Sequence, residues 1–153
     1  MTDTTNEKFV ESLSSLHTRL IDAAKGYEEA RTIGTDDAVK SLCIELGRDH
    51  SAHAHALAGI LLDLGRRPDS SGSFMAVVHK VAMNVRFAFS ADATSLLPGL
   101  RDGESRILES YDEALREAEA ARATEAHRAT LADQRAAVVA HIRRIDALKV
   151  ATG

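Results

Sequence analysis

The chain has 153 residues, the size of one domain, and 44% of them are hydrophobic and 27% charged. These values are typical of a globular protein, and no apolar run reaches the roughly 18 residues of a membrane span, so we expect no membrane partner. The net charge is -4 and both signs are mixed along the chain without a basic stripe, which predicts no nucleic-acid partner.

The N-terminus and the composition narrow the class further. No basic segment followed by an apolar one opens the chain, so the sequence does not look like a secretion signal and we expect a cytoplasmic protein. The single cysteine, Cys43, can form neither an internal disulfide nor a multi-cysteine zinc site. The chain has only two prolines, and aromatic residues make up 4% of it. This composition favours helix over sheet, so the predicted class is all-α.

Apolar residues at three- and four-residue spacing predict a first helix over about residues 6–33 and a second over about 36–64. Gly34 is the expected stop of the first helix and Thr35 the expected N-cap of the second. Gly65 and Pro68 end the second helix. The link between the two helices is so short that they form an antiparallel hairpin.

The second half of the chain repeats this pattern after the longest break. A shorter apolar helix is predicted over about residues 73–89, followed by long helices over about 94–120 and 124–149. The four long helices are similar in length, whereas the helix over 73–89 is shorter. The sequence therefore predicts a single domain, residues 1–153, built as a four-helix bundle in which one long crossover carries a short fifth helix.

Several short motifs occur in a fixed order along the chain. They are Leu64-Gly65, Pro68, Asp69, Ser71-Gly72-Ser73, His79-Lys80, Asp102-Gly103-Glu104, Tyr111, and His141 followed by Ile145 and Leu148. Together they resemble a bacterial family of ferritin-like four-helix-bundle proteins of unknown function, over roughly residues 9–149. The resemblance implies the ferritin-like bundle, a cytoplasmic location, a homodimer and an association with stress responses, and it implies no known reaction.

The chain departs from this family and from the ferritin-like metal motif. Family members often have arginine and tryptophan in the third helix, where this chain has Lys80 and Ala82. Ferritin-like di-iron proteins use one glutamate from each of two helices and a Glu-x-x-His pair from each of the other two. This chain has His50-x-x-His53 and Val138-x-x-His141 instead, so both motif glutamates are missing and we expect no standard di-iron centre.

Four metal-ligating side chains nevertheless fall on the apolar stripes of the predicted helices. They are His50, His53, Glu104 and His141. Imidazole and carboxylate suit zinc or iron(II), and a cation would compensate polar groups held in a low-dielectric interior. The sequence therefore predicts one zinc or iron ion in the bundle centre, held by these four residues.

The alternative is a metal-free polar layer. Each buried imidazole needs hydrogen-bond partners, and Glu104 or Gln134 could provide them. Asp49 neighbours the same face and is either a further ligand or a partner that orients a histidine. On this reading there is no cofactor, and the polar residues stabilise the fold.

Two classes of function follow. The first is a ferritin-like protein that binds or handles a metal ion. The second is a non-catalytic helical protein that acts through homodimerisation or a partner surface, favoured by apolar side chains over residues 74–89 that one short helix cannot bury. No nucleophile triad, phosphate loop or cofactor motif occurs, so an enzymatic role is not predicted.

Overall fold

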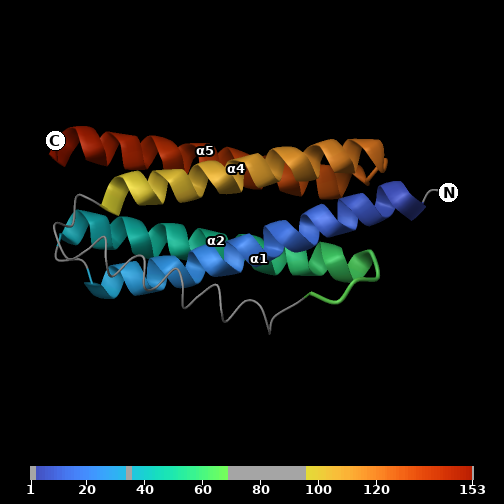
Figure 1. The fold of residues 1–153 in the computed structure, drawn as a ribbon, viewed down its shortest axis with the longest axis horizontal. Helices are drawn as coiled ribbons and strands as arrows, with labels where there is room; N and C mark the ends of the chain where they lie inside the picture. Colours follow the sequence, from blue (N-terminus) through green and yellow to red (C-terminus); the bar gives the residue numbers. More distant parts are fainter. Residues whose placement is uncertain (1–2, 34–35, 69–95, 153) are drawn as a thin grey trace.

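The computed structural model describes residues 3–33, 36–68 and 96–152, and these form four long α-helices (Figure 1). The helices are α1 (Asp3–Ile33), α2 (Asp37–Asp63), α4 (Leu96–Ala120) and α5 (Glu125–Thr152). No strand occurs in the described ranges. The prediction of an all-helical chain is therefore confirmed for the part that the structure describes.

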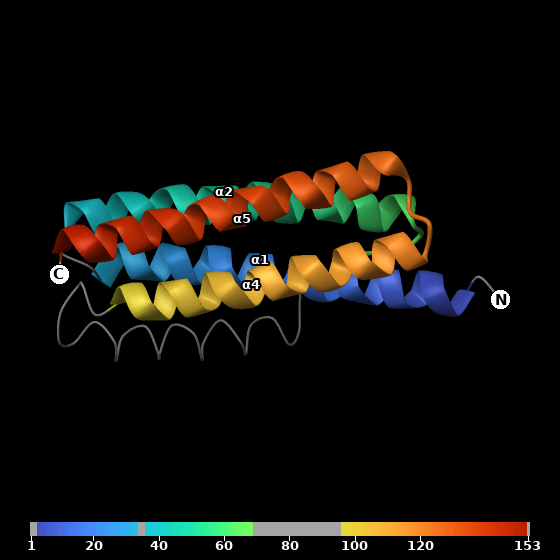
Figure 2. The ribbon, with the colours of Figure 1, turned by 90° about the horizontal axis from the view of Figure 1, so that it is seen from above.

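The helices pack as two antiparallel hairpins, one laid on the other (Figures 1 and 2). One hairpin is α1 with α2 and the other is α4 with α5, and α1 also packs along α4 while α5 lies over α2. The end of α2 and the start of α4 lie at opposite ends of the bundle, so these two helices run parallel. Parallel second and third long helices are what a bundle with one long connection requires.

The observed helix boundaries agree with the predicted ones to within about three residues. α1 begins at Asp3 and α5 continues to Thr152, a few residues beyond the predicted 6–33 and 124–149. The predicted short helix over 73–89 lies outside the described residues, as does the start of the predicted 94–120 helix. The description of the fold that the structure supports is a four-helix bundle.

The helix ends follow ordinary capping chemistry. The carboxylate of Asp36 accepts a hydrogen bond from the backbone N–H of Val39 at 3.0 Å, so Asp36 is the N-cap of α2 and the prediction of Thr35 was wrong. Gly65 has a φ of 82°, and the N–H of Arg66 bonds back to the carbonyl of Leu61 at 2.8 Å. The helix therefore ends at the glycine that the sequence predicted, and the structure adds that Gly65 is in the left-handed conformation.

The core runs along the whole bundle. The fully buried large side chains include Phe9, Leu13, Leu16, Leu20, Leu46, Leu57, Leu61, Leu97, Tyr111, Leu131 and Ile145. These residues come from all four helices and repeat at helical spacing, so each helix contributes one apolar stripe. The stripes are interrupted by polar residues near the middle, and these polar residues form the candidate site.

Candidate metal centre

Five polar side chains are buried in the described part of the bundle. They are His17, His50, Glu104, Gln134 and His141, each 6% exposed or less. Such residues are rarely so deeply buried without a partner. The three that lie closest together come from three different helices: His50 from α2, Glu104 from α4 and His141 from α5.

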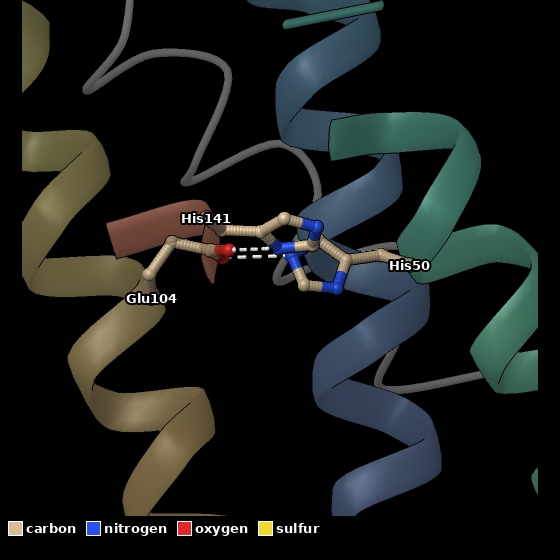
Figure 3. Close-up of side chains that lie close together, drawn as sticks. All are labelled: His50, Glu104 and His141. Carbon is tan, nitrogen blue, oxygen red and sulfur yellow. Dashed lines mark hydrogen bonds and ion pairs between the residues drawn. The ribbon is translucent and has the colours of Figure 1, made fainter. Parts of the chain in front are cut away.

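The carboxylate of Glu104 is the centre of this cluster (Figure 3). Its Oε2 lies 2.7 Å from Nε2 of His50, and its Oε1 lies 2.7 Å from Nδ1 of His141. The Glu104 side chain is only 1% exposed, so both contacts form away from water. One buried carboxylate therefore bridges two imidazole rings from the other two helices.

His141 lies between two carboxylates. Its second nitrogen, Nε2, is 2.8 Å from Oδ2 of Asp49, whose side chain is half exposed at the bundle surface. An ionised carboxylate can only accept hydrogen bonds, so both ring nitrogens of His141 must carry a hydrogen. In the metal-free state His141 is therefore an imidazolium cation, and its two partners are Glu104 and Asp49.

His50 has one paired and one unpaired ring nitrogen. Because Nε2 donates to Glu104, neutral His50 carries its hydrogen there and leaves Nδ1 as an acceptor. Nδ1 is buried and has no hydrogen-bond partner among the described residues. The ring also stacks on Tyr27 of α1, with centroids 5.8 Å apart and planes 25° apart. Thus α1 supplies an aromatic wall to the cluster, and the fourth helix takes part in the site.

The pKa shifts follow from these contacts. Burial alone would raise the pKa of Glu104, but the hydrogen bonds from His141 and His50 and the electrostatic attraction between the carboxylate and the two rings outweigh it and lower the pKa to about 2. Burial would lower the pKa of His141, and its bonds to Glu104 and Asp49 raise it instead. These contacts therefore favour the ionised form of Glu104 and the protonated form of His141.

The geometry of the three residues suits a metal ion. One nitrogen or oxygen from each of His50, Glu104 and His141 lies within 4.8 Å of the other two. Two imidazoles and a carboxylate are a ligand set that zinc and non-haem iron(II) both accept, with positions left for water or another ligand. A cation among these three atoms would face one negative charge and two neutral nitrogens once His141 has lost a proton.

His53, the fourth predicted ligand, is not part of this group. Its ring centroid lies 6.3 Å from that of His50, edge to face. Three residues along a helix displace a side chain by about 4.5 Å along the axis, which carries His53 away from the level of Glu104. Burial, and the neighbouring His50 after it, lower the pKa of His53 to about 4, so its ring is neutral at pH 7. Its Nδ1 has no partner among the described residues.

A second polar contact lies beside His53. The hydroxyl of Tyr111 donates to Oε1 of Gln134 at 2.8 Å, and Nε2 of Gln134 donates to the backbone carbonyl of His53 at 3.4 Å. Gln134 is therefore satisfied by Tyr111 and by the backbone of α2. The metal-free interpretation had Gln134 as a possible partner of an imidazole ring, whereas its two hydrogen bonds go to the hydroxyl of Tyr111 and the backbone of His53.

Tyr27 is the residue of this site that the sequence analysis missed. It lies on the apolar stripe of α1 and is 5% exposed, as an ordinary core residue would be. The sequence contains one signal that could have identified Tyr27. The short link between α1 and α2 sets the register of the hairpin and brings Tyr27 near the middle of α2. Gly47, one turn before His50, is indeed close enough that an added Cβ would lie 3.2 Å from Cβ of Tyr27.

The fold and the site define a helical-bundle protein with a buried histidine and glutamate cluster. A family model described as a domain of unknown function, DUF2383, matches residues 8–117, and the chain belongs to this family. The match includes most of α1, all of α2 and most of α4 with Glu104, and it stops before α5 and His141. No curated protein matches the chain significantly. No solved structure does either.

None of the described helices combines the length and hydrophobicity that crossing a membrane requires.

Proposed function

We propose that this protein binds a single divalent transition-metal ion, zinc or iron(II), through His50, Glu104 and His141. The observation that supports the proposal most directly is the convergence of three buried ligand atoms, one from each of three helices, within 4.8 Å. Burying a carboxylate and two imidazoles is costly, and a metal ion compensates that cost with bonds to all three.

Asp49 is the positioning residue in this proposal. Histidines that bind metals usually donate their other ring N–H to a carboxylate, which fixes the tautomer and the ring orientation. Nε2 of His141 already lies 2.8 Å from Asp49, so Nδ1 is the nitrogen that faces the site. This contact supports the role of an orienting partner for Asp49 over that of a further ligand.

One ion fits this ligand set better than two. The group contains a single carboxylate, and both positions of the Glu-x-x-His glutamates hold other residues, His50 and Val138. Two closely spaced cations would meet too little negative charge. The proposed protein is therefore a ferritin-like bundle with a one-metal centre, and no reaction is assigned to it.

The broader setting of the proposal rests on the sequence resemblance. The resemblance implies a ferritin-like relationship, a homodimer, a cytoplasmic location and a role in stress responses, and the proposal includes these four properties. The alternative function is that of a metal-free protein acting through homodimerisation or a partner surface. The apolar residues 74–89 that favour this alternative lie outside the described residues.

Calorimetric titration of chelator-treated protein tests the metal site. We expect one zinc or iron(II) ion per chain in the wild type, with iron measured without oxygen. His50→Ala and His141→Ala should each weaken binding at least about tenfold, since each removes a ligand. His53→Ala should stay close to the wild type because its ring lies outside the group.

The matched control is His55→Ala, which removes an exposed histidine from the same helix. Thermal unfolding of each variant shows whether it is folded before titration. Absence of binding in the wild type, or equal affinity in His141→Ala and His55→Ala, would leave the metal-free polar layer as the correct account.

A further inference from the structure

A groove of about 590 Å³ lies between α1 and α2, and its lining residues belong to these two helices alone. Its volume is within the range of small-molecule sites, about 300–1,000 Å³. None of the three residues of the proposed metal centre lines it. The groove is therefore a separate feature, and an inference drawn from it does not depend on the metal proposal.

The floor of the groove is made by small side chains. Ala24 comes from α1, and Cys43 and Gly47 come from α2. Position 47 favours glycine because a Cβ there would lie 3.2 Å from Cβ of Tyr27 on α1. Cys43 is 1% exposed, and burial raises the pKa of its thiol to about 11, so the thiol is protonated and unreactive. The floor is thus compact, mostly apolar and chemically inert.

The rim of the groove is cationic. Lys25 and Arg31 line it from α1 and Arg48 lines it from α2, whereas Glu28 is the single acidic side chain in the lining. Three positive charges and one negative charge give a local charge of +2, opposite in sign to the net charge of -4 on the whole chain. Glu28 is paired with Arg31 at 2.7 Å. The groove is therefore a local positive region on an acidic protein.

We propose that the groove between α1 and α2 binds a small organic anion, with its apolar body on the floor of small residues and its charged head at the rim. Arg48 and Lys25 face the head group from the two helices, and the hydroxyl of Ser51 adds a hydrogen-bonding group to the same lining. A carboxylate and a phosphate monoester share the chemistry that these groups recognise. An uncharged molecule of the same shape gains nothing from the rim.

Two fluorescent probes of nearly the same shape test the role of charge. 1-Anilinonaphthalene-8-sulfonate is an organic anion, and N-phenyl-1-naphthylamine is the same ring system without the sulfonate. We expect saturable binding of the anion to the full chain and at least about tenfold weaker binding of the neutral probe. Equal affinities for the two probes would overturn the proposal.

Substitutions locate the binding. Arg48→Gln and Lys25→Gln should each weaken binding of the anionic probe several-fold, and the double variant about tenfold or more. The matched control is Arg116→Gln, an exposed arginine on α4 outside the groove, which should bind as the wild type does. These side chains are exposed, so the variants should fold normally, and circular dichroism checks this. Equal binding in all variants would place the anion elsewhere.

Competition between the bound probe and simple organic anions identifies the preferred head group. Displacement of the probe by hexanoate or by hexyl phosphate supports the proposal and shows which head group is preferred, and displacement by neither contradicts it.

A second copy of the chain is the other occupant to consider. Light scattering that shows a dimer in the wild type and a monomer in the double variant would make the groove a contact between copies and overturn the ligand site.

Discussion

Replacing Glu104 by glutamine preserves the shape of the side chain and removes the charge at the centre of the cluster. The pKa of this carboxyl falls from 4.5 to about 2 in the fold. A difference of about 2.5 pKa units corresponds to about 3 kcal/mol of stabilisation of the ionised form. In chelator-treated protein at pH 6, we expect Glu104→Gln to lower the free energy of unfolding by about 3 kcal/mol.

Urea unfolding followed by circular dichroism measures this loss. The control is Glu109→Gln, an exposed glutamate on the same helix, which should change stability by less than about 0.5 kcal/mol. A loss below about 1 kcal/mol in Glu104→Gln would refute the reasoning, because it would mean that the two histidines do not depend on the charge of Glu104.

The same substitution has a pH signature. A carboxyl with a lowered pKa stabilises the fold above its unfolded pKa of about 4.5, and this contribution is lost as the pH falls toward 2. Stability measured from pH 5 down to pH 2 should therefore fall less steeply in Glu104→Gln than in the wild type. Parallel curves would show that another group causes the acid sensitivity.

Three further predictions concern the core, the imidazolium and the assembly. Leu57 is fully buried, so Leu57→Ala should cost roughly 2 to 5 kcal/mol in urea unfolding, whereas Leu62→Ala at a 61% exposed position should cost less than about 0.5. The raised pKa of His141 stabilises metal-free protein fully below pH 6.5, and the contribution is lost as the pH rises through the raised value. His141→Gln should therefore lose less stability than the wild type on going from pH 6 to pH 9, and an equal loss would argue against the imidazolium. The homodimer implied by the resemblance predicts twice the chain mass in light scattering at micromolar concentration, and a strictly monomeric mass would remove that prediction.

Helical periodicity predicted most of the described fold. Each long helix has an apolar stripe, and the stripe identifies the helix whatever it packs against. The helix termini depend on finer chemistry. A run of Thr35, Asp36 and Asp37 offers several capping side chains, and the choice of Asp36 depends on which backbone N–H groups lack partners.

The candidate site could be predicted only in part, because a stripe gives the angle of a residue around its helix and says nothing of the relative heights of two helices. Glu104, His50 and His141 were identified from their stripes, and the structure brings them to one level. His53 shares the stripe of His50 but lies about one turn away. The contact between His141 and Asp49 depends on the packing of α5 over α2, which no local pattern in either helix contains.

The most direct test of the metal site is a crystal structure of zinc-loaded protein with the anomalous signal measured at the zinc edge. The proposal predicts one strong peak per chain in the bundle interior, about 2.0 to 2.2 Å from Nε2 of His50, Nδ1 of His141 and a carboxylate oxygen of Glu104. Asp49 should remain hydrogen-bonded to Nε2 of His141. A peak at the surface only, or an interior in which Glu104 still bridges the two rings without a metal ion, would contradict the proposal.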